Sequence, residues 1–202
     1  MKRVYSGLEF GVNALITPDL SFKFNTPNKF LNTKMGSSWF IGFNIIERDL
    51  QLVKNKIALT TGLGFNWSGY RFDGNNFLTP NIDSVSATTS AAALSLNQLN
   101  TFDINAPLMI KFAPGRNNKK NKGFHIAAGA IFRYIASVNV QTETSANGYK
   151  QKVYLYDDFN ISPFKVDATV RVGYDKLRLF ANYSLTPYFN ANNADRKSTR
   201  LN

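Results

Sequence analysis

Residues 57–70 read IALTTGLGFNWSGY, and this stretch decides the fold class of the chain. Every second position is large and mostly apolar, and the positions between them are small or polar. The first set is Ile57, Leu59, Thr61, Leu63, Phe65 and Trp67, and the second is Ala58, Thr60, Gly62, Gly64, Asn66, Ser68 and Tyr70. A helix would scatter both sets around its circumference, whereas a strand sends them to opposite faces. The stretch therefore predicts one long β-strand.

The same alternation recurs in six further segments. They cover residues 5–14, 39–48, 101–112, 124–141, 164–174 and 177–186. Most exceed the five or six residues common in soluble proteins and reach the roughly 9–11 that cross a hydrocarbon layer. The seven segments predict an all-β, antiparallel up-and-down barrel that spans a membrane.

The connections between these segments alternate in length. Long ones cover residues 17–38, 71–98 and 142–163, and short ones cover 49–56, 113–123 and 175–176. Bacterial outer-membrane barrels have this asymmetry, with long loops outside and short turns in the periplasm. Within the second long loop we expect a short helix over residues 87–99.

Composition narrows the possible functions. The chain of 202 residues is long enough for one domain or one small barrel, and it contains no cysteine. A disulfide framework, a cysteine nucleophile and a cysteine-ligated metal are therefore excluded, and a single histidine excludes any site needing two imidazoles. We expect no metal and no cofactor. The net charge of +11 is spread along the chain without a basic helical stripe, which favours contact with membrane lipid over nucleic acid.

The polar face of the predicted strands combines many glycines with charges of both signs. The charged residues are Glu9, Asp103, Lys111, Arg133, Lys165, Asp167, Arg171 and Arg178, together with Arg48. In a narrow lumen such charges neutralise one another and form hydrogen bonds. We therefore expect a charge network inside the barrel, although the charged surface of a soluble barrel would give the same alternation.

The apolar face lacks charges at strand centres and carries aromatic residues toward strand ends. We predict an aromatic girdle made of Trp39, Trp67, Tyr134, Tyr174 and Tyr183. In the segment 124–141 we place Val138 and Val140 on this outer face as well.

Three stretches resemble a known family. They are residues 99–112, LNTFDINAPLMIKF, with Val172-Gly173-Tyr174 and Asn182-Tyr183-Ser184-Leu185-Thr186. The pattern from Tyr5 to about Asn190 is similar to the PorT-like and OmpA-like eight-stranded outer-membrane β-barrel proteins. The resemblance implies the bacterial outer membrane of gram-negative cells, no catalytic residues, and a partner in the envelope or secretion machinery.

The two ends of the sequence depart from that family. The segments number seven where eight are expected, and Met1-Lys2-Arg3 leads directly into the first strand without an apolar signal core. Residues 195–202 resemble translated adapter sequence. We therefore expect one barrel domain over residues 1–194, a non-native tail over 195–202, and a sequence that lacks its signal peptide and its last strand.

No arrangement of side chains predicts catalysis. His125 lies at the short-turn end, away from the outer leaflet, and Glu9, Asp103 and Asp167 are expected in ion pairs rather than as an acid–base pair. The sequence thus predicts a non-enzymatic outer-membrane barrel with a structural or partner-binding role, too narrow for a general diffusion porin. Two alternatives stay open: a soluble lipocalin-like barrel that binds a small apolar ligand, and a lipid-modifying enzyme.

Overall fold

The structure of the protein is a computed structural model. It describes residues 3–17, 19–26, 28–54, 56–80, 86–113, 124–146, 149–174 and 177–190. Over these residues it consists of β-strands and two short 3-10 helices, η1 (Asn28–Leu31) and η2 (Met35–Ser37). No helix in the described ranges is long and apolar enough to cross a membrane.

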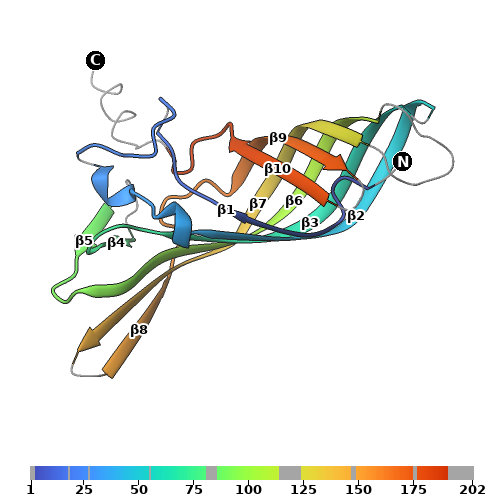
Figure 1. Ribbon diagram of the computed structural model, residues 1–202. Helices are drawn as coiled ribbons and strands as arrows, with labels where there is room; N and C mark the ends of the chain where they lie inside the picture. The colour runs from blue at the N-terminus through green and yellow to red at the C-terminus, as the bar shows by residue number, and fades with distance from the viewer. Residues whose placement is uncertain are drawn as a thin grey trace, which may run out of the picture.

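The main sheet is an antiparallel meander curled into a half-barrel (Figure 1). Its strands, in spatial order, are β1 (Gly7–Val12), β2 (Trp39–Val53), β3 (Ile57–Arg71), β6 (Leu94–Phe112), β7 (Phe124–Ala146), β9 (Phe164–Tyr174) and β10 (Leu177–Ser184). All seven predicted strands are confirmed, with chain order and neighbours as in an up-and-down barrel. The expected eighth strand, the domain end at residue 194 and the tail over 195–202 lie outside the described residues.

Two hairpins occupy what the sequence suggested were long loops. The strand β8 (Tyr149–Tyr156) pairs with the end of β7, and β4 (Asn76–Thr79) pairs with β5 (Ser86–Thr89). The helix expected over residues 87–99 is therefore wrong. Since β7 continues to Ala146, it offers backbone partners to residues 94–100, and β6 extends along it instead.

A bulge at Ile45 changes which residues of β2 face inward. Asn44 pairs with Gly64 and Ile46 with Leu63, so Ile45 has no opposite residue. One extra residue reverses the alternation beyond it. Glu47 and Asp49 consequently face the interior, and Arg48, which we placed in the lumen, lies outside and exposed.

A second bulge lies at Ala136 in β7, where Phe102 pairs with Ser137 and Asp103 with Ile135. Here too the alternation reverses. The placement of Val138 and Val140 on the outer face is therefore wrong: Val140 faces inward and is 1% exposed.

The interior changes character along its length. At the loop end, side chains from the strands and loops form an apolar cluster, made of Leu15, Leu31, Tyr70, Phe72, Leu78, Leu99, Ile135, Val140, Phe159 and Ile161. Below it most inward residues are polar or charged, and a smaller apolar cluster of Val4, Tyr5, Met109 and Ala127 lies among them. The outside of the same strands is apolar, for example at Leu8, Phe10 and Val170. This arrangement places charge in the lumen and apolar side chains around it.

Candidate functional site

The centre of the lumen holds an ion-paired group built around Arg133 of β7. Its Nε lies 2.7 Å from Asp167 Oδ2 on β9, and its Nη1 lies 3.4 Å from Asp103 Oδ2 on β6. Asn66 of β3 donates from Nδ2 to Asp103 Oδ1 at 2.8 Å. Four adjacent strands thus contribute to one connected group, which satisfies charges that would be costly to bury alone.

A second group joins Lys111 of β6 to β2. The Lys111 ammonium lies 3.1 Å from Glu47 Oε1 and also contacts Asp49. Glu47 accepts backbone hydrogen bonds from Val4, Tyr5 and Ser6, with Oε2 distances of 2.9–3.0 Å. One carboxylate therefore binds a lysine and also fixes the segment before β1 inside the barrel.

Glu47 and Asp49 were missed by sequence reasoning because the bulge at Ile45 reverses the period of two. Two signals could have found them. The doublet Ile45-Ile46 breaks the alternation, and Lys111 on an inward face needs a carboxylate nearby.

A third group joins β1, at one edge of the main sheet, to β9, which lies next to the other edge. Arg171 of β9 forms an ion pair with Glu9 of β1, through a hydrogen bond to Oε1 and a second, of 3.2 Å, to Oε2. Its guanidinium also lies 5.0 Å from the centre of the Tyr5 ring and 5.4 Å from that of Phe180. This cation is held by one carboxylate and two aromatic faces.

Two of the predicted network residues have other partners. Lys165 donates to the backbone carbonyls of Pro187 and Tyr188 and lies 4.8 Å from the centre of the Tyr188 ring. Arg178 donates to Ser6 O at 2.7 Å, and its side chain is exposed. Among the described residues neither forms an ion pair.

The predicted girdle residues Trp39, Trp67, Tyr134, Tyr174 and Tyr183 all lie on the outside of the sheet and are exposed. Near the loop end, Trp67 packs on Phe102 at 5.1 Å between ring centres, and Tyr134 packs on Phe164 at 5.2 Å. Tyr174 lies at the turn end, opposite Phe124. On β7 the stretch from Phe124 to Tyr134 matches the roughly 9–11 residues that span the hydrocarbon layer.

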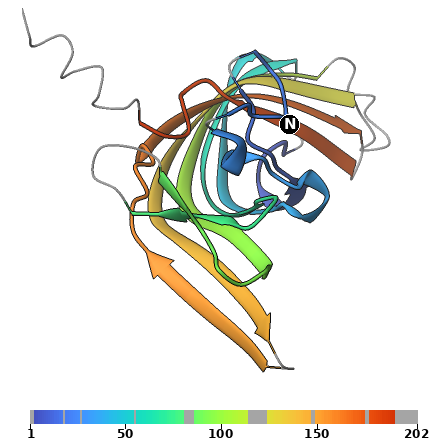
Figure 2. The same cartoon turned by 90° about the vertical axis from the view of Figure 1, so that its left-hand side faces the viewer.

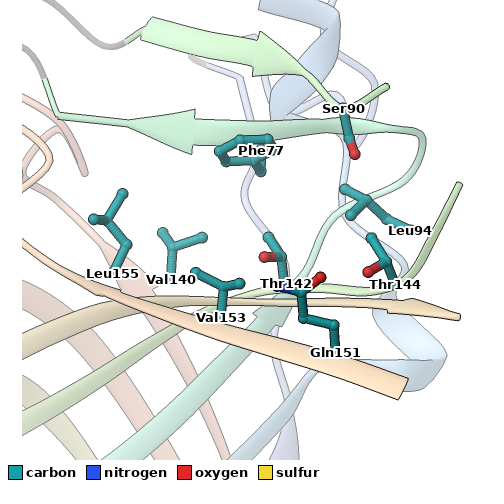
Figure 3. Close-up of a pocket in the computed structure, with 9 residues that line it drawn as sticks. All are labelled: Phe77, Ser90, Leu94, Val140, Thr142, Thr144, Gln151, Val153 and Leu155. Atoms are coloured by element: carbon teal, nitrogen blue, oxygen red, sulfur yellow. The ribbon is translucent and has the colours of Figure 1, made fainter. Parts of the chain in front are cut away.

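The loop end also carries a cleft of about 240 Å³ between the β4–β5 hairpin and the β7–β8 hairpin (Figure 3). Its apolar lining is Phe77, Leu94, Val140, Val153 and Leu155, and its polar lining is Ser90, Thr142, Thr144 and Gln151. The close-up shows Phe77 on one side of the cleft, facing Val140 and Val153 on the other. Such a surface can bind an apolar segment and orient it with hydroxyl and amide groups.

The described part of the chain contains no group of three or more His, Asp or Glu side chains suited to a metal ion. His125 is buried at the start of β7 and packs against Gly173 of β9, where a Cβ would lie 2.0 Å from its Nε2. The imidazole ring of His125 occupies the space that a side chain at position 173 would take.

An apolar exterior with aromatic rings near both ends and an ion-paired interior define an outer-membrane β-barrel. The chain belongs to the family described as outer membrane protein beta-barrel domain, which matches residues 2–192. It is accordingly a protein of the bacterial outer membrane. Comparisons with curated proteins and with solved structures gave no significant match.

Proposed function

We propose that this barrel is a non-enzymatic, PorT-like protein of a gram-negative outer membrane that binds an envelope or secretion partner at its loop end. The observation that carries the proposal is the contrast between the two candidate sites. The charged side chains of the lumen are held in ion pairs and hydrogen bonds, whereas the cleft between the hairpins presents apolar side chains to solvent.

The lumen is better suited to stability than to transport. Asp103 and Lys111 are completely buried, and the apolar cluster lies above them at the loop end. Small barrels of about eight strands have interiors that side chains fill. Reconstituted in liposomes, the protein should therefore give no swelling in sugars that pass through a general porin.

The cleft is the surface that we propose for the partner. Val153 and Leu155 of β8 face the cleft. One edge of β8 pairs with β7, and its other edge pairs with no described strand, so the main-chain groups of an extended segment could form hydrogen bonds there. The partner should therefore present an extended segment with apolar side chains at alternate positions.

The test uses the absence of native cysteine. A photo-crosslinker attached to Gln151→Cys, in the cleft, should give one discrete adduct in intact cells. The same reagent on Lys23→Cys, an exposed residue of another loop, is the matched control. Adding Val153→Asp to the cleft variant should abolish the adduct while the barrel remains heat-modifiable on a gel. Equal adducts from both positions, or an adduct that survives Val153→Asp, would refute the cleft as the binding surface.

A further inference from the structure

The β7–β8 hairpin leans away from the barrel. Seen from the loop end, it extends beyond the curved row of strands instead of continuing along the barrel (Figure 2). Figure 1 shows the same divergence from the side. One face of this hairpin lines the cleft, and the opposite face continues the outer, lipid-facing surface of β7.

On that outer face, the type of side chain changes stepwise beyond the aromatic girdle. Phe102 and Tyr134 are the last aromatic residues of β6 and β7 on this face, and beyond them only Leu96, opposite Glu143, is large and apolar. Next come amides, since Asn100 donates from Nδ2 to Asn139 Oδ1 at 3.0 Å and Gln98 pairs with Gln141. A row of amides directly above aromatic side chains marks the level where hydrocarbon gives way to headgroups.

Two tyrosines of β8 lie at that level. Tyr156 is opposite Asn139 and Tyr154 is opposite Gln141, so both point to the outer face. They are 68% and 51% exposed. A ring with a polar hydroxyl suits the membrane interface, where one end is apolar and the other is hydrated.

Two lysines follow the tyrosines on the same face. Lys150 Nζ lies 3.3 Å and Lys152 Nζ 3.5 Å from the two oxygens of Glu143, and their side chains remain 69% and 53% exposed. One carboxylate is shared by two ammonium groups, so this face carries a net positive charge. Exposed cations beside an interface attract anionic lipid headgroups.

We propose that the outer face of the β7–β8 hairpin lies on the outer leaflet and binds lipid phosphates. Tyr154 and Tyr156 sit at the headgroup level, and Lys150 and Lys152 contact the phosphates. Continuity with the lipid-facing surface of β7 and the complementary charge both support this occupant. This lipid-binding face is opposite the proposed partner cleft, so the proposal does not depend on whether a partner binds in the cleft.

The experiment compares two adjacent residues of β7, which lie at nearly the same distance along the hairpin but on its opposite faces. Ser145→Cys places a thiol on the outer face, and Thr144→Cys places one on the cleft face. Each full-length variant is folded into phosphatidylcholine vesicles with or without lipid A, which carries phosphates, and its rate of labelling by a membrane-impermeant maleimide is measured. Heat-modifiable migration establishes that each variant is folded.

We expect lipid A to slow labelling several-fold in the Ser145→Cys variant and to leave labelling unchanged in the Thr144→Cys variant. Lys150→Gln with Lys152→Gln should remove the slowing, arginine at both positions should retain it, and added salt should weaken it. The pair Lys23→Gln with Lys29→Gln, in another loop, should have no effect. Equal labelling in the two vesicles, slowing in both thiol variants, or slowing that survives the glutamine pair would overturn the proposal.

Discussion

Arg133 and Asp167, on neighbouring strands β7 and β9, form an ion pair with a 2.7 Å separation inside the barrel. Asp103 lies on the other side of the same guanidinium. Removing one partner of a buried pair costs more than the pair itself contributes, because the remaining charge is left desolvated. The lumen should therefore be sensitive to neutral substitutions that hardly change shape.

Asp167→Asn should lower the free energy of unfolding by about 3–5 kcal/mol, since Arg133 then loses its closer carboxylate. Urea unfolding in detergent micelles measures this change. Asp73→Asn is the control, because Asp73 pairs with Lys34 on the surface and both side chains are more than half exposed. That variant should change stability by less than about 1 kcal/mol. Equal effects at the two sites would contradict the buried pair.

Gly173→Ala should destabilise the barrel by about 1–3 kcal/mol through overpacking, since the new methyl group would overlap the His125 ring. His125→Ala in the same chain should recover part of the loss, which the shift of the urea midpoint measures. Gly36→Ala is the matched control, because no atom of the described residues lies within 4 Å of the place that its methyl group would take. Absence of any rescue would argue against contact between the imidazole and residue 173.

Glu47→Gln should release the segment before β1. A neutral amide is a weaker acceptor for the three backbone N–H groups and no longer pairs with Lys111. Hydrogen exchange of Tyr5 and Ser6 should accelerate, as measured by mass spectrometry of the N-terminal peptide. Asp49→Asn removes a contact to Lys111 but none to the segment, so exchange there should stay slow. Acceleration in both variants would assign the effect to Lys111 instead.

The β7–β8 hairpin should loosen in acid. Partial burial tends to raise the pKa of Glu143, but the hydrogen bond and charge of Lys150, and then Lys152, lower this pKa below its ordinary value. A depressed carboxyl pKa contributes stability above the unfolded-state pKa, and this stability is lost as the pH falls through the folded-state value.

Exchange of β8 amides, corrected for intrinsic rates, should therefore show constant protection near neutrality and a decline below the ordinary glutamate pKa of 4.5. Glu143→Gln should remove that decline. An unchanged pH profile in the variant would mean that another group controls the hairpin.

The sequence predicted the strands well because alternation over long segments is a strong signal. In residues 57–70 every expected inward residue does face the lumen side of β3, because the bulges in its ladder with β2 lie on β2 and leave the alternation of β3 intact. The errors in assigning residues to the inner or outer face each follow a local interruption of the period. The single extra residues Ile45 and Ala136 each reverse the faces beyond them, which hid Glu47 and Asp49 and misplaced Val140.

Other features depend on tertiary contacts that a linear pattern does not contain. Lys165 binds carbonyls at residues 187 and 188, and Arg178 binds the carbonyl of Ser6. Backbone acceptors carry no residue-type signal, so neither partner could be predicted. The extension of β6 over residues 94–100 likewise depends on how far β7 continues.

The ion pair of Arg171 with Glu9 joins residues 162 positions apart, and the bond from Arg178 to Ser6 joins residues 172 positions apart. Contacts this distant in sequence require nearly the whole chain to be in place, and proteins dominated by such contacts fold slowly. The segment around β1 pairs locally with β2, but Glu9 and the Ser6 carbonyl acquire these two partners only after β9 and β10 have formed. Closure of the barrel in the membrane is therefore expected to be a late step of assembly, because the contacts from β1 to β9 and β10 can form only when the last strands are in place.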